Sequence, residues 1–281
     1  FAGKTLGLSA QPSVPMTTPR YLPNCLFFFA GIFPLAGLTA AAETITDAHY
    51  STPVKRYGHF ALGQPHEYAR LTATTSSGRL VSFELPDDEV FEDLQPRMIK
   101  LAANEAEEML TIVSQRNNGA RLVLIKLNGD HLTISAQSPA IGKAMRWLNP
   151  VGAVDLDADG QAEIAAVITP HLAGPLKVYQ RQGKHLTEIA ALPGFSNHVY
   201  GSSELALSMP LSIAGHMRLL VPDASRMQLR IIALEKNRLV EIGRCPLNAP
   251  IVGAIKSVSS QEISVGLLNG EQTINPNQCV K

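Results

Sequence analysis

The chain has 281 residues and a formal net charge of zero, since 24 lysines and arginines balance 24 aspartates and glutamates. Hydrophobic residues make up 45% of the chain, and no basic face stands out along it. This charge pattern argues against a nucleic-acid partner, because such partners are bound through clustered Lys and Arg side chains.

The chain begins with the pattern of a secretory signal peptide. Arg20 precedes the apolar run 26–38, and the small residues 39–42 follow. This order of charged, apolar and small residues predicts cleavage after Ala42. The alternative is an uncleaved membrane anchor, but a proline in the run and an Ala-rich end favour cleavage. We therefore expect an exported protein, periplasmic or secreted, that does not insert into a membrane after cleavage.

Removal of the leader, residues 1–42, leaves residues 43–281, which are within reach of one large all-β domain. Met16 is a sensible translation start, because a short charged region follows it. The leader contains Lys4 and Arg20 and no acidic residue, so its loss shifts the net charge to about −2. We expect the remaining domain to be a monomer.

A repeated hairpin pattern runs through the middle of the chain, with an apolar strand, a polar turn and a second strand in each copy. Apolar residues recur ten positions apart across the turns, as Leu80 with Val90, Leu122 with Leu132, Leu176 with Leu186, and Leu229 with Leu239. Asn128-Gly129, Gln182-Gly183 and Lys236-Asn237 are suitable hairpin turns. The first copy is looser, with Pro86-Asp-Asp88 at its turn.

Two further short strands are expected before each hairpin. The nearer strands are 70–74, 109–113, 164–168 and 218–221, and the farther ones are 59–62, 98–101, 151–154 and 210–213. Units of three to four strands that recur every 42 to 54 residues match the blades of a β-propeller.

A shorter unit at the end of the chain starts a fifth blade, with strands at 251–255 and 263–267. We expect the segment 44–52 to supply its missing outer strand and so to join the two ends of the ring. The prediction is thus an all-β fold, a β-propeller of five blades closed by the N- and C-terminal segments. A solenoid or a β-sandwich is the structural alternative.

An acidic loop in the third unit has the residue types and spacing of a calcium site. Carboxylates alternate with other residues, and Gly160 follows at the sixth position, where such loops turn sharply. Carboxylates this close repel one another unless a hard cation lies between them. The expected calcium ligands are Asp155, Asp157, Asp159, the backbone carbonyl of Gln161, and Glu163.

An EF-hand shares the beginning of this loop but requires a bidentate Glu at position twelve and a helix on each side. Here Ala166 occupies position twelve, and the flanks 151–156 and 164–168 are β-type runs. The loop is therefore expected to join two strands. The simpler alternative is an acidic, solvated turn with no bound ion.

The loop, its flanking strands and the following segment 174–179 resemble the FG-GAP repeat of integrin α-subunit propellers and of bacterial exported proteins with VCBS-type repeats. The resemblance covers residues 149–179, and it implies a β-propeller with calcium in an interstrand loop. Corresponding segments at 101–107 and 213–217 lack the acidic residues, so we expect one calcium site. The resemblance is to an uncharacterised bacterial family, and it implies a fold and an ion but no reaction.

Two cysteines follow the leader, Cys245 and Cys279. In an exported protein an even pair predicts a disulfide. It would close a loop of roughly 35 residues and contribute about 3 kcal/mol to stability. Two buried free thiols are the alternative.

The expected function is a non-catalytic binding module for an unidentified protein or glycan ligand, with calcium in a structural role. The alternative is an enzyme, a hydrolase or lyase, whose loop histidines converge on a transition metal or act as acid and base. The candidate histidines are His59, His66, His171, His185, His198 and His216. No nucleophile elbow, phosphate loop, zinc-type cysteine pair or dinucleotide fingerprint is present.

Three other features have two interpretations each. Trp147 is expected to pack between strands rather than to stack on a sugar. The acidic runs 86–93 and 105–108 are expected to be solvated loops rather than a second cation site.

Overall fold

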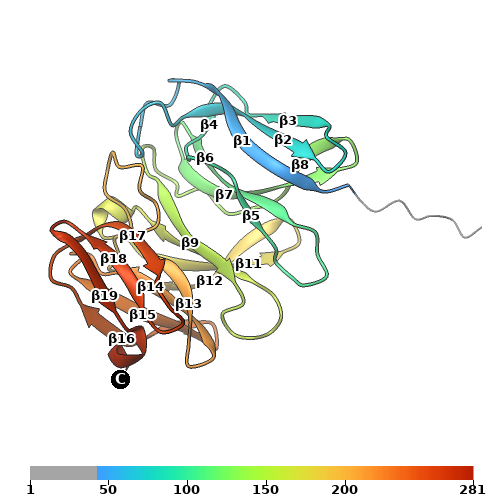
Figure 1. The fold of residues 1–281 in the computed structure, drawn as a ribbon. Helices are drawn as coiled ribbons and strands as arrows, with labels where there is room; N and C mark the ends of the chain where they lie inside the picture. Colours follow the sequence, from blue (N-terminus) through green and yellow to red (C-terminus); the bar gives the residue numbers. More distant parts are fainter. Residues whose placement is uncertain (1–42, 281) are drawn as a thin grey trace, which may run out of the picture. The chain divides into compact units, whose positions relative to one another are not determined.

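The computed structural model describes residues 43–280, which belong to the same structural unit (Figure 1). The described residues form β-strands and two short 3-10 helices, which confirms the all-β prediction. None of their helices is long and apolar enough to cross a membrane. The signal-peptide prediction concerns residues 1–42, which lie outside the described part of the chain.

The first half of the unit contains two antiparallel groups of strands that belong to one sheet. The first group consists of β1 (Ile45–Pro53), β2 (Tyr68–Thr75), β3 (Leu80–Glu84) and β4 (Glu89–Phe91), and the second of β5 (Arg97–Ile99), β6 (Glu108–Gln115), β7 (Gly119–Asn128) and β8 (His131–Gln137). In the first group β2 lies between β1 and β3, and in the second group neighbours in sequence pair in order. The short strand β4 pairs with β2 and with β6, and so joins the two groups.

The second half of the unit repeats the four-stranded meander. The third group consists of β9 (Leu148–Val154), β10 (Glu163–Ile168), β11 (Leu176–Gln182) and β12 (His185–Leu192), and the fourth of β13 (Met209–Ile213), β14 (His216–Pro222), β15 (Gln228–Glu235) and β16 (Arg238–Pro246). The last group, the tail sheet, has three strands, β17 (Ile251–Ser257), β18 (Ile263–Leu267) and β19 (Gly270–Ile274). The 3-10 helices are η1 (Pro170–Leu172), which follows β10, and η2 (Pro276–Cys279), which follows the tail sheet.

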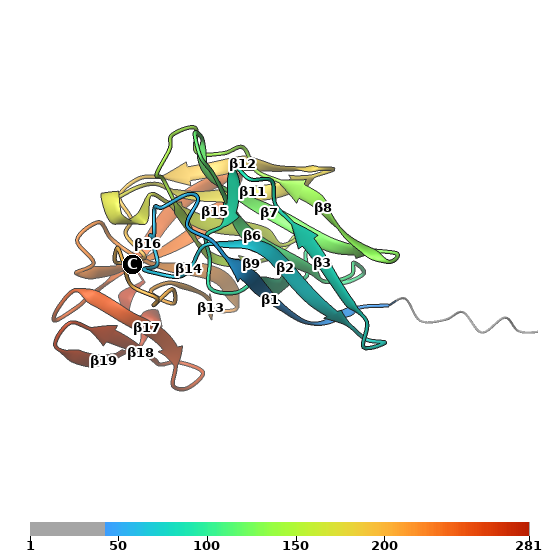
Figure 2. The same ribbon diagram turned by 90° about the horizontal axis from the view of Figure 1, so that it is seen from above.

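Three of the four predicted hairpins are confirmed, namely β7–β8, β11–β12 and β15–β16 (Figure 2). Their tight turns are encoded locally. Lys236 and Asn237, for example, both adopt a left-handed backbone, with φ of 51° and 58°, as a two-residue turn between twisted strands requires.

The first predicted hairpin is wrong. β3 pairs with β2, while β4 pairs with β6, so the segment 86–88 connects two strands that are not partners. The three residues of β4 are all buried, which places them between neighbouring strands rather than at the end of a hairpin.

The predicted strand 59–62 is also absent. The Glu67 carboxylate accepts backbone N–H groups of Gly58, His59 and Phe60 at 3.0, 2.9 and 3.2 Å. A side chain thus takes the hydrogen bonds that a neighbouring strand would otherwise supply.

The expected ring closure by the N-terminal segment is wrong as well. β1 pairs with β2 from Ile45 opposite Thr75 to Pro53 opposite Tyr68, and the tail sheet keeps three strands. Burial explains this choice, because the Tyr50 ring stacks on Tyr68 and on Phe91, with centroids 5.8 and 4.9 Å apart. The sheets formed by residues 43–280 are open, and no closed ring is seen among them.

The core is apolar and centred on β-strands that are covered on both faces. All six residues of β10 are buried, as expected for a central strand with a continuous apolar run. Trp147 is 1% exposed and donates a hydrogen bond from Nε1 to the Glu92 carbonyl at 2.8 Å. The prediction that Trp147 is a packing residue is confirmed.

Candidate metal loop and histidine pocket

The predicted calcium loop connects β9 to β10, as the sequence indicates. Carboxylate oxygens of Asp155, Asp157 and Asp159 all lie within 4.8 Å of one another. The loop turns through Ala158 and Gly160, whose φ angles are 64° and 89°. Three negative charges are thus held close together on one loop, an arrangement that a cation would relieve.

Backbone hydrogen bonds fix the shape of this loop. Asp155 accepts N–H groups from Asp159 at 3.2 Å and from Gly160 at 2.9 Å, and Asp159 accepts from Gln161 at 2.7 Å. Gln161 also forms an isolated bridge with Ala102, which attaches the end of the loop to the segment after β5. The loop is therefore built by its own acidic side chains.

Glu163 is the first residue of β10, and its side chain is fully buried. Oε2 accepts the Leu156 N–H at 2.9 Å, whereas Oε1 is buried with no hydrogen-bond partner among the described residues. Burial, followed by the charges of Asp157, Asp159 and Asp155, raises the pKa of Glu163 to about 7. An unpartnered buried carboxylate oxygen beside three aspartates fits a hard cation such as calcium, which prefers oxygen ligands.

A hollow of about 520 Å³ lies beside this loop. Its lining includes Asp155 and Asp157 from the loop, His216 from the start of β14 and Lys236 from the β15–β16 turn. The hollow therefore presents charged groups of both signs from two consecutive meanders.

The structure brings three of the six candidate histidines together at a second site, the histidine pocket, with a volume of about 340 Å³. Its lining residues are His59, Met145, Arg146, Trp147, Thr169, His171, Leu172 and Tyr200. The His198 ring lies behind this lining, with its centroid 5.0 Å from that of His171 and 4.9 Å from that of Trp147. The three histidines come from the β1–β2 loop, η1 and the long β12–β13 connection.

His59 is oriented by a buried carboxylate. Its Nδ1 lies 2.8 Å from Oε1 of Glu92. The Glu92 side chain is fully buried. Its Oε2 accepts a hydrogen bond from Ser114 Oγ at 2.6 Å, and its Oε1 accepts one from the Ala61 N–H at 3.2 Å. With Nδ1 protonated toward the carboxylate, the lone pair of the imidazole is on Nε2. Nε2 has no partner among the described residues, and His59 lines the pocket.

His171 and His198 face each other directly, with their Nδ1 atoms 3.3 Å apart. Nε2 of His198 donates to the Ser202 carbonyl at 2.8 Å. Burial and then the neighbouring His198 lower the pKa of His171 to about 4, and burial lowers the pKa of His198 to about 4. Both rings are therefore neutral at pH 7.

The other three histidines lie elsewhere. Nδ1 of His66 lies 3.4 Å from the Tyr68 hydroxyl, and His185 and His216 are exposed at the starts of β12 and β14.

The sequence pattern does not single out Glu92, because it predicts a solvated loop over residues 86–93. In the structure Glu89, Glu92 and Asp93 are buried, which corrects that interpretation. The apolar Val90-Phe91 pair inside the run was the signal for burial.

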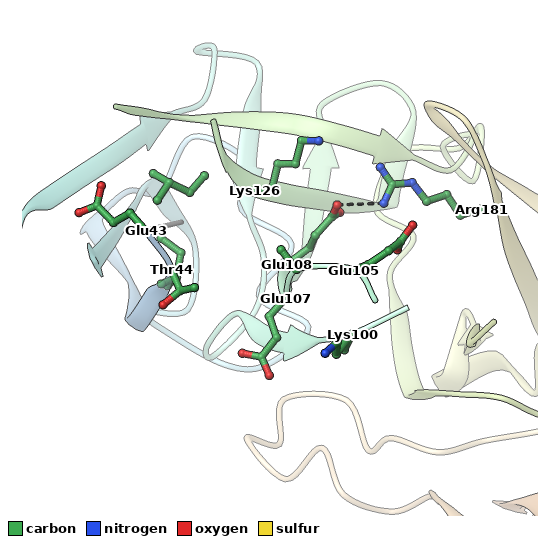
Figure 3. Close-up of a pocket in the computed structure, with 11 residues that line it drawn as sticks. Glu43, Thr44, Lys100, Glu105, Glu107, Glu108, Lys126 and Arg181 are labelled. Carbon is green, nitrogen blue, oxygen red and sulfur yellow. Dashed lines mark hydrogen bonds and ion pairs between the residues drawn. The ribbon is translucent and has the colours of Figure 1, made fainter. Parts of the chain in front are cut away.

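The second acidic run, 105–108, borders a charged groove of about 570 Å³ (Figure 3). Figure 3 shows the Glu108 carboxylate reaching Arg181, at 2.9 Å, while the carboxylate of Glu107 points away. Lys100 and Lys126 also line the groove. Among the described residues only the aspartate loop brings three such ligands within 4.8 Å, and this groove is a surface of mixed charge.

A disulfide joins Cys245 of β16 to Cys279 of η2, with a Cα–Cα distance of 5.2 Å. Cys245 is buried, and the bond attaches the end of the chain to the fourth meander. This is the pairing that the sequence predicts.

No protein-family model matches the chain, and no curated protein matches it. The FG-GAP resemblance therefore depends on residues 149–179 alone.

Proposed function

We propose that the chain is an exported calcium-binding module of the FG-GAP or VCBS type, in which the ion stabilises the fold. The observation that carries this proposal is Glu163, a buried carboxylate with one unpartnered oxygen beside three converging aspartates. The proposed ligands are Asp155, Asp157, Asp159, the Gln161 carbonyl and Glu163. Calcium bound to these oxygens would offset the repulsion within the loop.

The proposed role of the ion is structural because of where the loop lies. It connects β9 to β10, and β10 is buried throughout. An ion that binds only the folded loop adds its binding free energy to the stability of the fold. The loop also attaches to Ala102, so the ion would order a contact between the second and third groups.

The proposed biological role is the binding of a protein or glycan ligand by a monomeric domain, and the hollow beside the loop supports it. Its walls come from two meanders and contain Asp157, His216 and Lys236. We further infer that the meanders are divergent copies of one blade repeat, from a five-bladed propeller. The recurrence of four antiparallel strands that pair in sequence order in the second, third and fourth groups supports this inference.

Thermal unfolding with calcium and with excess chelator tests the proposal. We expect a higher melting temperature in calcium for the natural protein and no calcium effect for Asp157→Ala. Asp87→Ala is the control, because Asp87 is fully exposed and lies outside the loop. Equal melting temperatures with calcium and with chelator in the natural protein would refute a structural calcium site.

A second candidate function is acid–base catalysis in the histidine pocket, and one specific observation favours it. The Glu92–His59 pair has the geometry of a carboxylate-oriented general base in a hydrolase or lyase. A panel of nitrophenyl esters and glycosides tests this function. Turnover that is lost in His59→Gln and kept in His185→Gln would support it, and turnover equal in both variants would refute it.

A further inference from the structure

The histidine pocket contains two imidazoles that meet nitrogen to nitrogen. In most protein sites a histidine nitrogen faces a carbonyl, a carboxylate or water, so a 3.3 Å approach of two Nδ1 atoms needs an explanation. The Ser202 carbonyl accepts a hydrogen bond from Nε2–H of His198, so the lone pair of this neutral ring is on Nδ1. Two lone pairs at this distance repel, so the space between His171 and His198 holds either one proton or a metal ion.

The spacing of the two nitrogens suits a metal ion. Zinc–nitrogen bonds are about 2.0–2.1 Å long, and two ligands of a tetrahedral ion are then about 3.3 Å apart. Imidazole nitrogens are ligands that suit zinc, copper and nickel.

The surroundings have the features of a metal site. The His198 ring is held through its second nitrogen by a backbone carbonyl, as metal-ligating histidines usually are. His171 lines the pocket, which gives the ion a route from solvent. Across the pocket His59, oriented by Glu92, has an Nε2 lone pair that can accept a hydrogen bond from a metal-bound water.

We propose that the histidine pocket binds one first-row transition metal ion, zinc or copper, through Nδ1 of His171 and Nδ1 of His198. The remaining coordination positions open to the pocket and hold water or a small ligand. This site is separate from the calcium loop and does not depend on it, since the donors there are oxygens and the donors here are nitrogens.

Equilibrium dialysis of the purified, tag-free protein against zinc, with calcium in excess, tests the proposal. We expect one zinc ion per chain, and a Kd raised more than about 100-fold in His171→Gln and in His198→Gln. His185→Gln is the matched control, because His185 is exposed and is not part of the pocket lining, and it should bind as the natural protein does.

Copper supplies a readout that does not depend on affinity alone. The electron paramagnetic resonance spectrum of the copper-loaded protein should show hyperfine coupling to two nitrogens, and His171→Gln should remove one of them. A cooperative melting curve of each variant reports whether it is folded. The proposal is overturned by a natural protein that retains no zinc, by a folded His171→Gln variant that binds zinc equally well, or by a copper spectrum with oxygen ligands only.

Discussion

The Glu163→Gln substitution should have opposite effects on stability with and without calcium. Glutamine keeps the size of the side chain and an oxygen that can accept the Leu156 N–H, but it has no negative charge. Without calcium the substitution removes a buried charge that three aspartates repel, so it should stabilise the protein. With calcium it removes a proposed ligand, so it should abolish most of the stabilisation by the ion.

The magnitude follows from the pKa of Glu163. This pKa rises from 4.5 to about 7 on folding, so the folded state holds the proton more tightly than the unfolded state. Stability should therefore be greatest below pH 4.5 and fall as the pH rises toward 7. At pH 8 the free energy of unfolding is lower by about 3 kcal/mol than its low-pH value. This loss corresponds to roughly 6 to 12 °C in melting temperature for a domain of this size.

Melting curves at pH 8 and at pH 5, in chelator and in calcium, measure this effect. In chelator at pH 8 Glu163→Gln should melt above the natural protein, and at pH 5 the two should nearly coincide. Asp87→Ala controls for the loss of an exposed carboxylate. A Glu163→Gln variant that melts below the natural protein in chelator at pH 8 would refute the reasoning.

Three further predictions concern stability. Burial lowers the pKa of His198 to about 4, so the contribution of this residue to stability is present above pH 6.5 and is lost as the pH falls to 4. The loss is about 3 kcal/mol in the free energy of unfolding. Urea unfolding in chelator should show this dependence on pH, and His198→Gln should flatten it. Replacing Cys245 and Cys279 by serine should lower the free energy of unfolding by about 3 to 4 kcal/mol, and an unchanged urea midpoint would contradict this. Gly174→Ala should cost more than about 2 kcal/mol, because a Cβ there would lie 1.7 Å from the Ile168 carbonyl oxygen, and an unchanged melting temperature would contradict it.

Elements encoded by neighbouring residues could be predicted from the sequence. The β15–β16 hairpin depends on two turn residues that accept a left-handed backbone, and the acidic loop between β9 and β10 depends on nine consecutive positions. Choices between distant partners were not predictable in this way. The alternation of side chains in β1 fits the edge of the first group and the edge of the tail sheet equally well. The burial of Tyr50 against Phe91 determines the pairing with β2.

The histidine pocket was only partly predictable, for the same reason. The candidate set contained His59, His171 and His198, but no spacing in the sequence separated them from His66 or His185. Their convergence depends on irregular connections rather than on strand periodicity. The segment around His59, for example, is shaped by hydrogen bonds to the Glu67 carboxylate, which no local motif indicates.

The disulfide has a mechanical consequence for the end of the chain. All three strands of the tail sheet lie between Cys245 and Cys279, and so inside one covalent loop. Tension applied at the C-terminus therefore passes from η2 through the sulfur atoms into β16 and bypasses the tail sheet. The fourth meander bears that load, and the tail sheet is pulled open only after the sulfur–sulfur bond is reduced.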